Sequence, residues 1–316
     1  MNSRRTGILA ALSSAFFLGM APVFGKQAIL LGLHWSGVVS IRTVLAALLL
    51  LVFILVYNRR FLYIYPAGLL GCFLAGAING IGSLLYYGAL SRINASLGQL
   101  LYALYPFFVL IWMWMDHQPP GRLTILRLLL VIPGGYLLTR APFTNVDFTG
   151  VLMMLASAAL YALHLPINQR VLYDMPAPTV TLYTLTAMSI IVLPAFVISR
   201  IFFNAPPVIP VISIAWGPVL GLTLVTFLSR LALFLGVKHL GGLQTAVLGL
   251  GELIVALVFS HLLLREHLSL HQWLGALLLV TSLFMVALEK DQPRRFTGGW
   301  LSWLRPPGLP KDFPLP

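Results

Sequence analysis

Long apolar runs recur along nearly the whole chain, and they constrain its fold more than any other feature. A helix that crosses a bilayer needs about 20 predominantly apolar residues. Because lipid cannot satisfy backbone polar groups, each such run must close its hydrogen bonds internally as a helix. We therefore predict an all-α integral membrane protein with ten transmembrane helices: Gly7–Leu31, Ser36–Tyr57, Pro66–Ser91, Ala95–Met115, Leu123–Thr139, Phe148–Arg170, Pro178–Arg200, Val211–Lys238, Gly242–Leu264 and His267–Glu289.

The composition supports this class. Only 9% of the residues are charged and 59% are hydrophobic, whereas soluble domains carry about 25% charged residues. The net charge of +12 would suit nucleic acid, but apolar spans leave no basic groove, so we expect the lipid bilayer and no nucleic acid as partner. Cys72 is the single cysteine, which excludes an intrachain disulfide and a cysteine metal cluster.

The distribution of basic residues predicts the orientation. Cytoplasmic loops are enriched in Lys and Arg. With the N-terminus in the cytoplasm, the outer side holds Arg92, Arg140, Arg200 and Arg265. The inner side then holds Arg4, Arg5, Arg59, Arg60, Arg122, Arg170, Lys238, Lys290, Arg294, Arg295, Arg305 and Lys311. We therefore expect a multi-pass protein of the cell (inner) membrane with both termini in the cytoplasm.

Four basic residues lie within the predicted spans. Lys26, Arg42 and Arg127 are near helix ends, from which long side chains can reach the bilayer surface. Arg230 lies deeper in its span. We expect the first three to extend to the surface and Arg230 to face the interior of the protein.

The chain repeats itself after about half its length. The run Ala89–Ala95 parallels Gly236–Gly242 at an offset of 147. Five spans are an odd number, so the second half enters the membrane in the opposite direction. We predict two inverted five-helix repeats, residues 1–140 and 141–289, and a basic tail, residues 290–316, that contains Pro and Trp and lies on the inner membrane surface. Inverted repeats are typical of secondary transporters, whose substrate site lies near the midplane.

Arg230 and Glu252 flank the short turn Lys238–Gly242. They lie ten and twelve residues from Leu240, so antiparallel helices would bring them within roughly 3 Å of the same depth. An ionisable residue inside a membrane normally faces a partner or a watery cavity. Two interpretations stay open: a structural ion pair, or the wall of a transport pathway in which Arg230 holds a carboxylate and Glu252 an ammonium group.

Polar stripes at helical spacing run along four predicted helices. Residues three or four apart share one helix face, and faces from both halves could line one cavity, with tyrosines as aromatic walls that carry a hydroxyl tip. The alternative is that these groups only hydrogen-bond between helices. The candidate substrate-binding residues are Asn79, Ser83 and Tyr86; Gln99, Tyr102 and Tyr105; Tyr161, His164 and Asn168, in line with Ser157; and Thr226 with Arg230 and Glu252.

Glu252 is also the first candidate for proton coupling, because the other acidic residues lie at span ends. His164 is the second, since imidazole titrates near physiological pH. The sequence has no Gly-x-Ser-x-Gly elbow, Walker loop or dinucleotide fingerprint, and His267 and His271 beside Glu266 lack the HExxH order of a zinc site. We expect no enzyme, no metal and no cofactor, and a monomer or homodimer.

Several runs resemble the EamA family of the drug/metabolite transporter superfamily. They are Gly19–Lys26, Leu85–Ala95 with Tyr105-Pro106, and Glu252 with Arg265–Gly275. The resemblance implies a ten-helix carrier that exports or exchanges small metabolites, often amino acids, without an ATP site. The alternatives are a flippase for a lipid-carrier headgroup with the same fold and, more remotely, a membrane-embedded enzyme.

Overall fold

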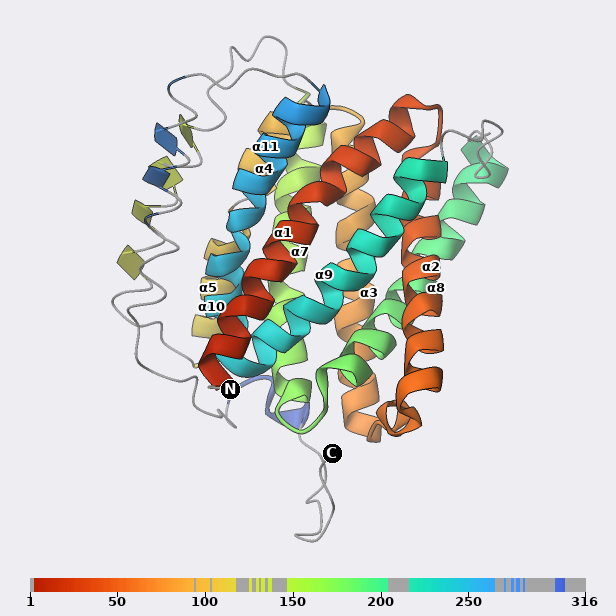
Figure 1. Ribbon diagram of the computed structural model, residues 1–316, viewed down its shortest axis with the longest axis vertical. Helices are drawn as coiled ribbons and strands as arrows, with labels where there is room; N and C mark the ends of the chain where they lie inside the picture. The colour runs from red at the N-terminus through yellow and green to blue at the C-terminus, as the bar shows by residue number, and fades with distance from the viewer. Residues whose placement is uncertain are drawn as a thin grey trace, which may run out of the picture.

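The computed structural model describes residues 3–93, 95–102, 104–117, 147–203, 216–264 and 299–304, with scattered residues between 125 and 137 and between 270 and 281. Within these residues the chain is helical (Figure 1). The predicted spans Leu123–Thr139 and His267–Glu289 fall largely outside the described residues.

Six helices are long and apolar enough to cross a membrane. They match the first, second, third, sixth, seventh and eighth predicted spans, so the all-α membrane class and these six spans are confirmed as helices of spanning length. Their bounds are α1 (Ser3–Leu30), α2 (Trp35–Tyr57), α3 (Pro66–Leu90), α7 (Phe148–Leu172), α8 (Ala177–Phe203) and α9 (Trp216–Leu240).

The fourth predicted span is not one helix, as we expected, but two. It consists of α4 (Ala95–Tyr102) and α5 (Tyr105–Met115). Pro106 stands in the first turn of α5. Because proline lacks an N–H and its ring clashes with the carbonyl four residues before it, a continuous helix cannot pass through this position without a kink.

The ninth predicted span is divided in the same way, and the prediction of a continuous helix is wrong there too. It consists of α10 (Gly242–Gly249) and α11 (Gly251–Leu264). At the break, the Leu250 N–H donates to Val247 O at 3.2 Å, so the helix tightens and the carbonyl of Ala246 loses its usual partner. The flanking glycines make this break inexpensive, since glycine is a poor helix former.

The six long helices pair reciprocally. The first helix of each half packs on the third helix of the other, and the two second helices pack together, as α1 with α9, α3 with α7 and α2 with α8. Each pair is antiparallel, so α7 runs opposite to α3. In each pair, residues near the start of one helix contact residues near the end of the other. These contacts are Gly7 with Leu240 and Phe24 with Gly221 for α1 and α9, Gly71 with Val171 and Gly88 with Met153 for α3 and α7, and Ser36 with Ser199 for α2 and α8.

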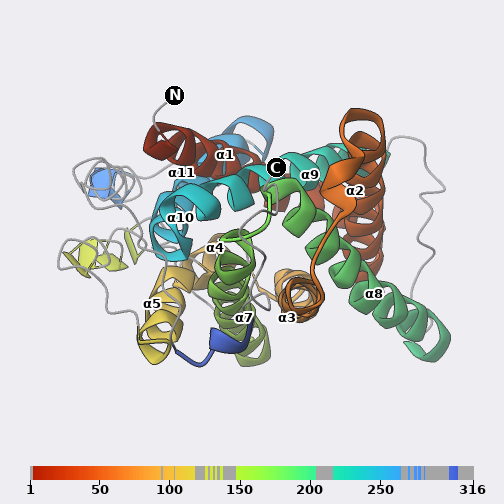
Figure 2. The same cartoon turned by 90° about the horizontal axis from the view of Figure 1, so that it is seen from below.

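Seen along the helices, the bundle has no separate lobes among its described parts. Figure 2 shows α7 between α5 and α3, with α10 next to α5, and contacts between residues agree with each of these pairs. The helix that begins the second half is therefore embedded among helices of the first half.

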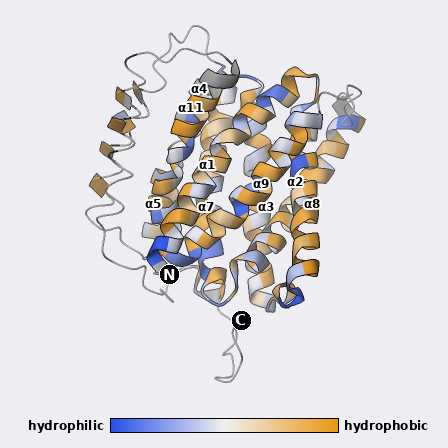
Figure 3. Ribbon diagram, viewed as in Figure 1, coloured by the Kyte–Doolittle hydropathy of each residue, from blue (hydrophilic) through white to orange (hydrophobic). Residues whose placement is uncertain are grey.

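The outward faces of the long helices are apolar, as Figure 3 shows along α2 and α8. Leu30, Val56 and Ile190 are 70%, 83% and 53% exposed. Large apolar side chains exposed in this number would favour aggregation in water, whereas hydrocarbon accommodates them. These surfaces are therefore the lipid-facing surfaces of the protein.

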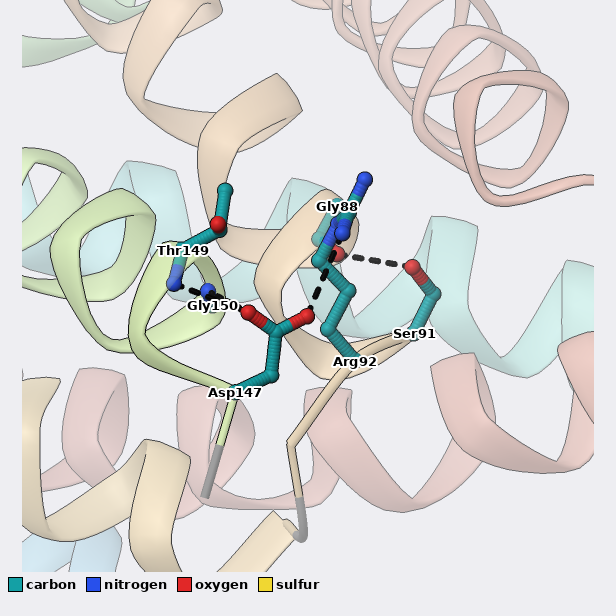
Figure 4. Close-up of polar contacts among 6 residues, drawn as sticks. All are labelled: Gly88, Ser91, Arg92, Asp147, Thr149 and Gly150. Carbon is teal, nitrogen blue, oxygen red and sulfur yellow. Dashed lines mark hydrogen bonds and ion pairs between the residues drawn. The ribbon is translucent and has the colours of Figure 1, made fainter. Parts of the chain in front are cut away.

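At one end of the bundle, the end of α3 is tied to the start of α7 (Figure 4). Asp147 caps α7, and its Oδ1 accepts from the N–H of Thr149 at 2.8 Å. Its Oδ2 accepts from Arg92 Nη1 at 3.2 Å. The Arg92 guanidinium lowers the pKa of the Asp147 carboxyl below its usual value. An acidic cap also interacts favourably with the helix dipole.

At the opposite end, part of the tail packs into the bundle. Leu301 and Leu304, before and within the short helix η3 (Ser302–Leu304), are each 1% exposed. The Leu301 N–H donates to Asp116 Oδ1 at 3.2 Å, while Asp116 Oδ2 pairs with Arg170 of α7. Residues 299–304 therefore pack against the helices rather than lying on the bilayer surface as we expected.

One glycine tests the close packing between the halves. A Cβ at Gly76 in α3 would collide with the backbone oxygen of Thr184 in α8. Overpacking of this kind costs about 1–3 kcal/mol, more than the roughly 0.5–1 kcal/mol that alanine gains over glycine within a helix. We expect Gly76→Ala to lower the thermal midpoint in detergent, measured by unfolding of the purified protein.

The matched control is Gly217→Ala in α9, where a new Cβ would meet nothing within 4 Å. It should leave the midpoint unchanged or raise it slightly. Equal effects of the two substitutions would contradict close contact between α3 and α8.

The Arg92–Asp147 pair predicts a pH dependence. Because the pKa of Asp147 is lowered in the folded protein, its ionised form stabilises the fold above the ordinary carboxyl pKa of about 3.9. That stability is lost as the pH falls through the lower, folded-state pKa. Asp147→Asn keeps a capping side chain but removes the charge. We expect it to melt below the unsubstituted protein at pH 7 and low salt, with the gap closing on acidification.

Arg92→Gln is the matched control, since it removes the same pair from the other side. It should lower the thermal midpoint at pH 7 as Asp147→Asn does, and this difference from the unsubstituted protein should likewise shrink as the pH falls. A difference in thermal midpoint that stays constant from pH 7 to pH 3, about one unit below the ordinary carboxyl pKa, would show that the charge of Asp147 does not stabilise the fold.

Candidate functional site

A polar cavity lies among helices from both halves of the chain. It is lined from α1, α2, α3, α4, α7, α9 and α11, and so by helices of both halves. Three of its lining residues carry ionisable side chains other than tyrosine, namely Arg42, Arg230 and Glu252.

Most of the residues predicted as substrate-binding face this space, and four do not. Those that line the cavity are Asn79, Ser83, Tyr86, Gln99, Tyr102, Tyr161, Arg230 and Glu252. Tyr105, His164, Asn168 and Thr226 are not among its lining residues. The polar stripes that the sequence predicts therefore continue along their helices beyond the cavity.

Arg230 enters the cavity from the middle of α9 and is only 5% exposed. In the amide orientation that matches donors with acceptors, the Asn79 side-chain oxygen accepts from both Nη1 and Nη2, each at 3.2 Å. The guanidinium carbon lies 5.6 Å from the centre of the Tyr161 ring, within the range of a cation–π contact. Its Nε has no hydrogen-bond partner among the described residues. Arg230 is thus held by neutral groups.

Glu252 faces the same cavity from the first turn of α11, immediately after the helix break. It is 3% exposed, and its Oε1 has no hydrogen-bond partner within the described part of the chain. Gly19 of α1 lies against its backbone oxygen, where a Cβ would approach to 2.5 Å. Close packing of α1 and the break at Leu250 together place this carboxylate at the cavity wall.

Arg230 and Glu252 share a cavity, but neither a hydrogen bond nor an ion pair joins them in the described structure. Of the two interpretations that the sequence left open, the geometry favours two charges that face a common space.

Arg42 was missed as a site residue. We expected it to extend to the bilayer surface, yet it is 5% exposed and lines the cavity. Its Nη2 donates to Ser83 Oγ at 3.3 Å, and its guanidinium carbon lies 4.8 Å from the centre of the Tyr87 ring. Its position, less than three turns into α2, suggested surface access. The nearby polar stripe on α3 was the signal that could have placed it inside.

Tyrosine rings form a continuous wall. The ring centre of Tyr102 lies 4.9 Å from that of Tyr86, in an edge-to-face contact at 71°, and 5.4 Å from that of Tyr161, with the rings tilted at 45°. The Gln99 amide donates to the Tyr86 hydroxyl. Aromatic pairs prefer edge-to-face and offset arrangements, and such pairs add to the packing energy. The wall thus offers ring faces and hydroxyl groups to one ligand.

Tyr105 lies outside the lining and seals the helix break. Its hydroxyl donates to Ala246 O at 2.8 Å, the carbonyl that the break in α10 and α11 leaves without its helical partner. A Cβ on Gly249 would occupy the place of this hydroxyl. Glycine is therefore required at position 249 for the approach of Tyr105.

The other three predicted residues make structural contacts. His164 is fully buried with its Nδ1 against Tyr161 O. Asn168 donates to His164 O at 3.0 Å and accepts from Thr184 at 3.1 Å. Thr226 donates to Leu222 O of its own helix at 2.7 Å. Of these contacts, only the Thr184–Asn168 bond joins two helices, as in the alternative of polar groups that hydrogen-bond between helices, and the others lie within one helix.

The cavity occupies one half of the bundle. Its lining residues on α2, α3 and α7 lie in the helix halves nearest to the Arg92–Asp147 pair or, in the case of Tyr161, near the middle of the helix. The other half is filled by an apolar core that includes Leu165, Leu172 and Phe234. The site is thus nearer to one end of the helices than to the other.

A bundle of membrane-spanning helices whose halves enclose a buried polar cavity defines a class, the integral membrane transporters. The model of the EamA-like transporter family matches the sequence twice, at residues 5–140 and 148–288. The chain belongs to this family, with two family repeats in one polypeptide, and the resemblance found in the sequence is confirmed. It is a membrane transporter of the drug/metabolite transporter type.

A solved structure described only as "Crystal structure of protein" superposes with a TM-score of 0.73. The alignment covers 90% of this chain and 97% of the solved chain at 17% sequence identity, so it supports the fold alone. No curated protein matches the sequence significantly.

The Tyr105 hydroxyl gives a test of the sealed break. Tyr105→Phe removes one hydrogen bond and leaves the buried Ala246 carbonyl without it, a loss of about 1–3 kcal/mol. We expect a lower thermal midpoint in detergent. Tyr57→Phe is the matched control, because Tyr57 is 74% exposed at the end of α2. Indistinguishable midpoints for the two variants would contradict the role of Tyr105.

Proposed function

We propose that this protein is a secondary transporter of small amphipathic metabolites such as amino acids, working by alternating access between two inverted five-helix repeats. One observation carries the proposal. Arg230 and Glu252 are buried in one cavity between the halves without a bond to each other. Ionisable residues inside a membrane protein commonly mark substrate pathways.

The two charges suit the two ends of a zwitterion. The guanidinium of Arg230 presents several N–H donors in a plane, which matches a carboxylate. Glu252 offers a carboxylate oxygen without a partner, which suits an ammonium group. Because a buried charge is costly unless paired, a substrate that supplies both partners stabilises the cavity. The tyrosine wall takes the apolar part of the substrate.

The arrangement of the helices supports alternating access. The reciprocal, antiparallel pairing of α1–α3 with α7–α9 is the pairing that two inverted repeats produce. The breaks between α4 and α5 and between α10 and α11 lie beside the cavity, as do the discontinuous helices of many carriers. With the N-terminus in the cytoplasm, the cavity lies toward the outer side. The family resemblance favours export or exchange.

A proton is the proposed coupling ion. Glu252 can hold a proton when no ammonium group neutralises it, which links proton and substrate binding at one carboxylate. His164 is less suited, because its ring lies against Tyr161 and Phe234 rather than in the cavity. Collapse of the proton gradient in proteoliposomes should then abolish accumulation but leave downhill flux.

The direct test is flux in liposomes with a panel of labelled amino acids. Arg230→Gln and Glu252→Gln each remove one partner of the zwitterion. Losing a buried charge-assisted contact costs about 2–5 kcal/mol, so we expect flux at subsaturating substrate to fall at least about tenfold. Arg200→Gln, at the exposed end of α8, is the matched control and should retain flux.

Two results would overturn the proposal. Normal flux in both cavity variants would remove these charges from the mechanism. Movement of lipid-linked sugars without movement of any amino acid would instead identify a flippase of the same fold.

A further inference from the structure

Arg42 has no role in the zwitterion contact just described, although it is built into the same cavity. It is buried, its Nη2 donates to Ser83 Oγ, and its Nε has no hydrogen-bond partner among the described residues. No carboxylate pairs with it in the described structure. A buried cation kept in this way requires an explanation, because an unpaired charge in an apolar interior is costly.

The two cavity arginines are held alike. Each guanidinium is bound by a neutral side chain of α3 and lies over a tyrosine ring, Arg42 on Ser83 and Tyr87, Arg230 on Asn79 and Tyr161. Each also leaves its Nε without a partner. Neutral partners fix the position of a cation without cancelling its charge. Both arginines therefore keep their affinity for an anion.

The anchors of the two arginines are close together. Asn79 and Ser83 are four residues apart on one face of α3, so they lie about 6 Å apart along the helix axis. The two carboxyl carbons of glutamate are separated by four carbon–carbon bonds, which span about 5 Å when extended. The spacing of the two anchors on α3 is thus similar to the spacing of the two carboxyl groups of glutamate.

The charge balance points the same way. Among the described lining residues, the side chains that can carry a full charge are two arginines, Arg42 and Arg230, and one carboxyl, Glu252, so the formal charge is +1 when Glu252 has released its proton beside a bound ammonium group. A neutral zwitterion would leave this excess buried. A ligand with two carboxylates and one ammonium group carries a net charge of −1 and cancels it.

We propose that the substrate is a dicarboxylic amino acid. One carboxylate binds Arg230, the other binds Arg42, and the ammonium group binds Glu252, while the methylene chain packs on the tyrosine wall. This assignment rests on the proposed function and narrows it to one substrate class. Arg42 is then the residue that distinguishes an acidic side chain from a neutral one.

The experiment compares two substrates of nearly equal shape, L-glutamate and L-glutamine, in tracer flux into proteoliposomes. We expect the unsubstituted protein to prefer glutamate by at least about tenfold, since a site built for a polar group discriminates strongly against an analogue that lacks it. Arg42→Gln should lower glutamate flux at least about tenfold and lower glutamine flux by a smaller factor, so the preference is lost.

Arg42→Lys serves as the second variant. It keeps the charge but not the fork of donors, and it should retain part of the glutamate preference. Thermal stabilisation by each amino acid gives a readout independent of flux. If Arg42→Gln fails to fold, the glutamate preference of the unsubstituted protein and its reduction in Arg42→Lys decide the matter.

The outcomes separate this inference from the proposed function. Equal flux of glutamate and glutamine, or an equal loss of both in Arg42→Gln, overturns the dicarboxylic assignment while amino acid transport stands. Absence of flux for every amino acid of the panel overturns both.

Discussion

Every polar group inside this bundle must find its partner within the protein, because lipid offers none. Ser14 and Ser157 donate to carbonyls of neighbouring helices at 2.9 and 2.7 Å, and Thr226 donates within its own helix. The rule has exceptions among the described residues, and two of them, His164 Nε2 and Gln244 Oε1, lie outside the cavity lining. Arg42, Arg230 and Glu252 also each keep one polar atom without a partner among the described residues, and these three ionisable groups line one cavity. Under the proposed function, a ligand supplies the missing partners of these three groups.

The helix breaks obey the same rule and thereby position the site. Breaking α10 from α11 frees the carbonyl of Ala246, and the Tyr105 hydroxyl from the other broken helix replaces the lost partner. The break between α10 and α11 is thus satisfied by a side chain from the first half. The break between α10 and α11 also positions Glu252. This residue lies in the first turn of α11, where its backbone packs against Gly19, and its side chain lines the cavity.

The sequence predicts the long helices well, because apolar runs of spanning length admit no other structure in lipid. It also predicts the stripe on α3, since Asn79, Ser83 and Tyr86 share one face whatever the helix packs against. It misplaces Arg42, because distance from a helix end does not reveal which way a side chain turns. The sequence contains signals for both breaks, namely Pro106 and the glycines around Leu250. A prediction based on the length of apolar runs ignores these residues and therefore gives one continuous helix in each case.

The contacts between the halves are unequal, and this limits how they can move. The pair α3 and α7 is tied near both ends and in the middle. At one end Arg92 binds Asp147; at the other, Leu304 of the tail lies against Gly71, and Leu301 binds Asp116, the partner of Arg170. In the middle Ser157 donates to Gly82 O. These contacts join two helices from opposite halves. The α1–α9 pair carries fewer polar ties and borders the cavity at Pro22 and Arg230. In a carrier that alternates, the easier path is for α1 and α9, with the broken helices beside them, to shift against α3 and α7. Such a shift would separate Arg230 and Glu252 from Asn79 and Ser83, and so dismantle the site as it opens to the other side.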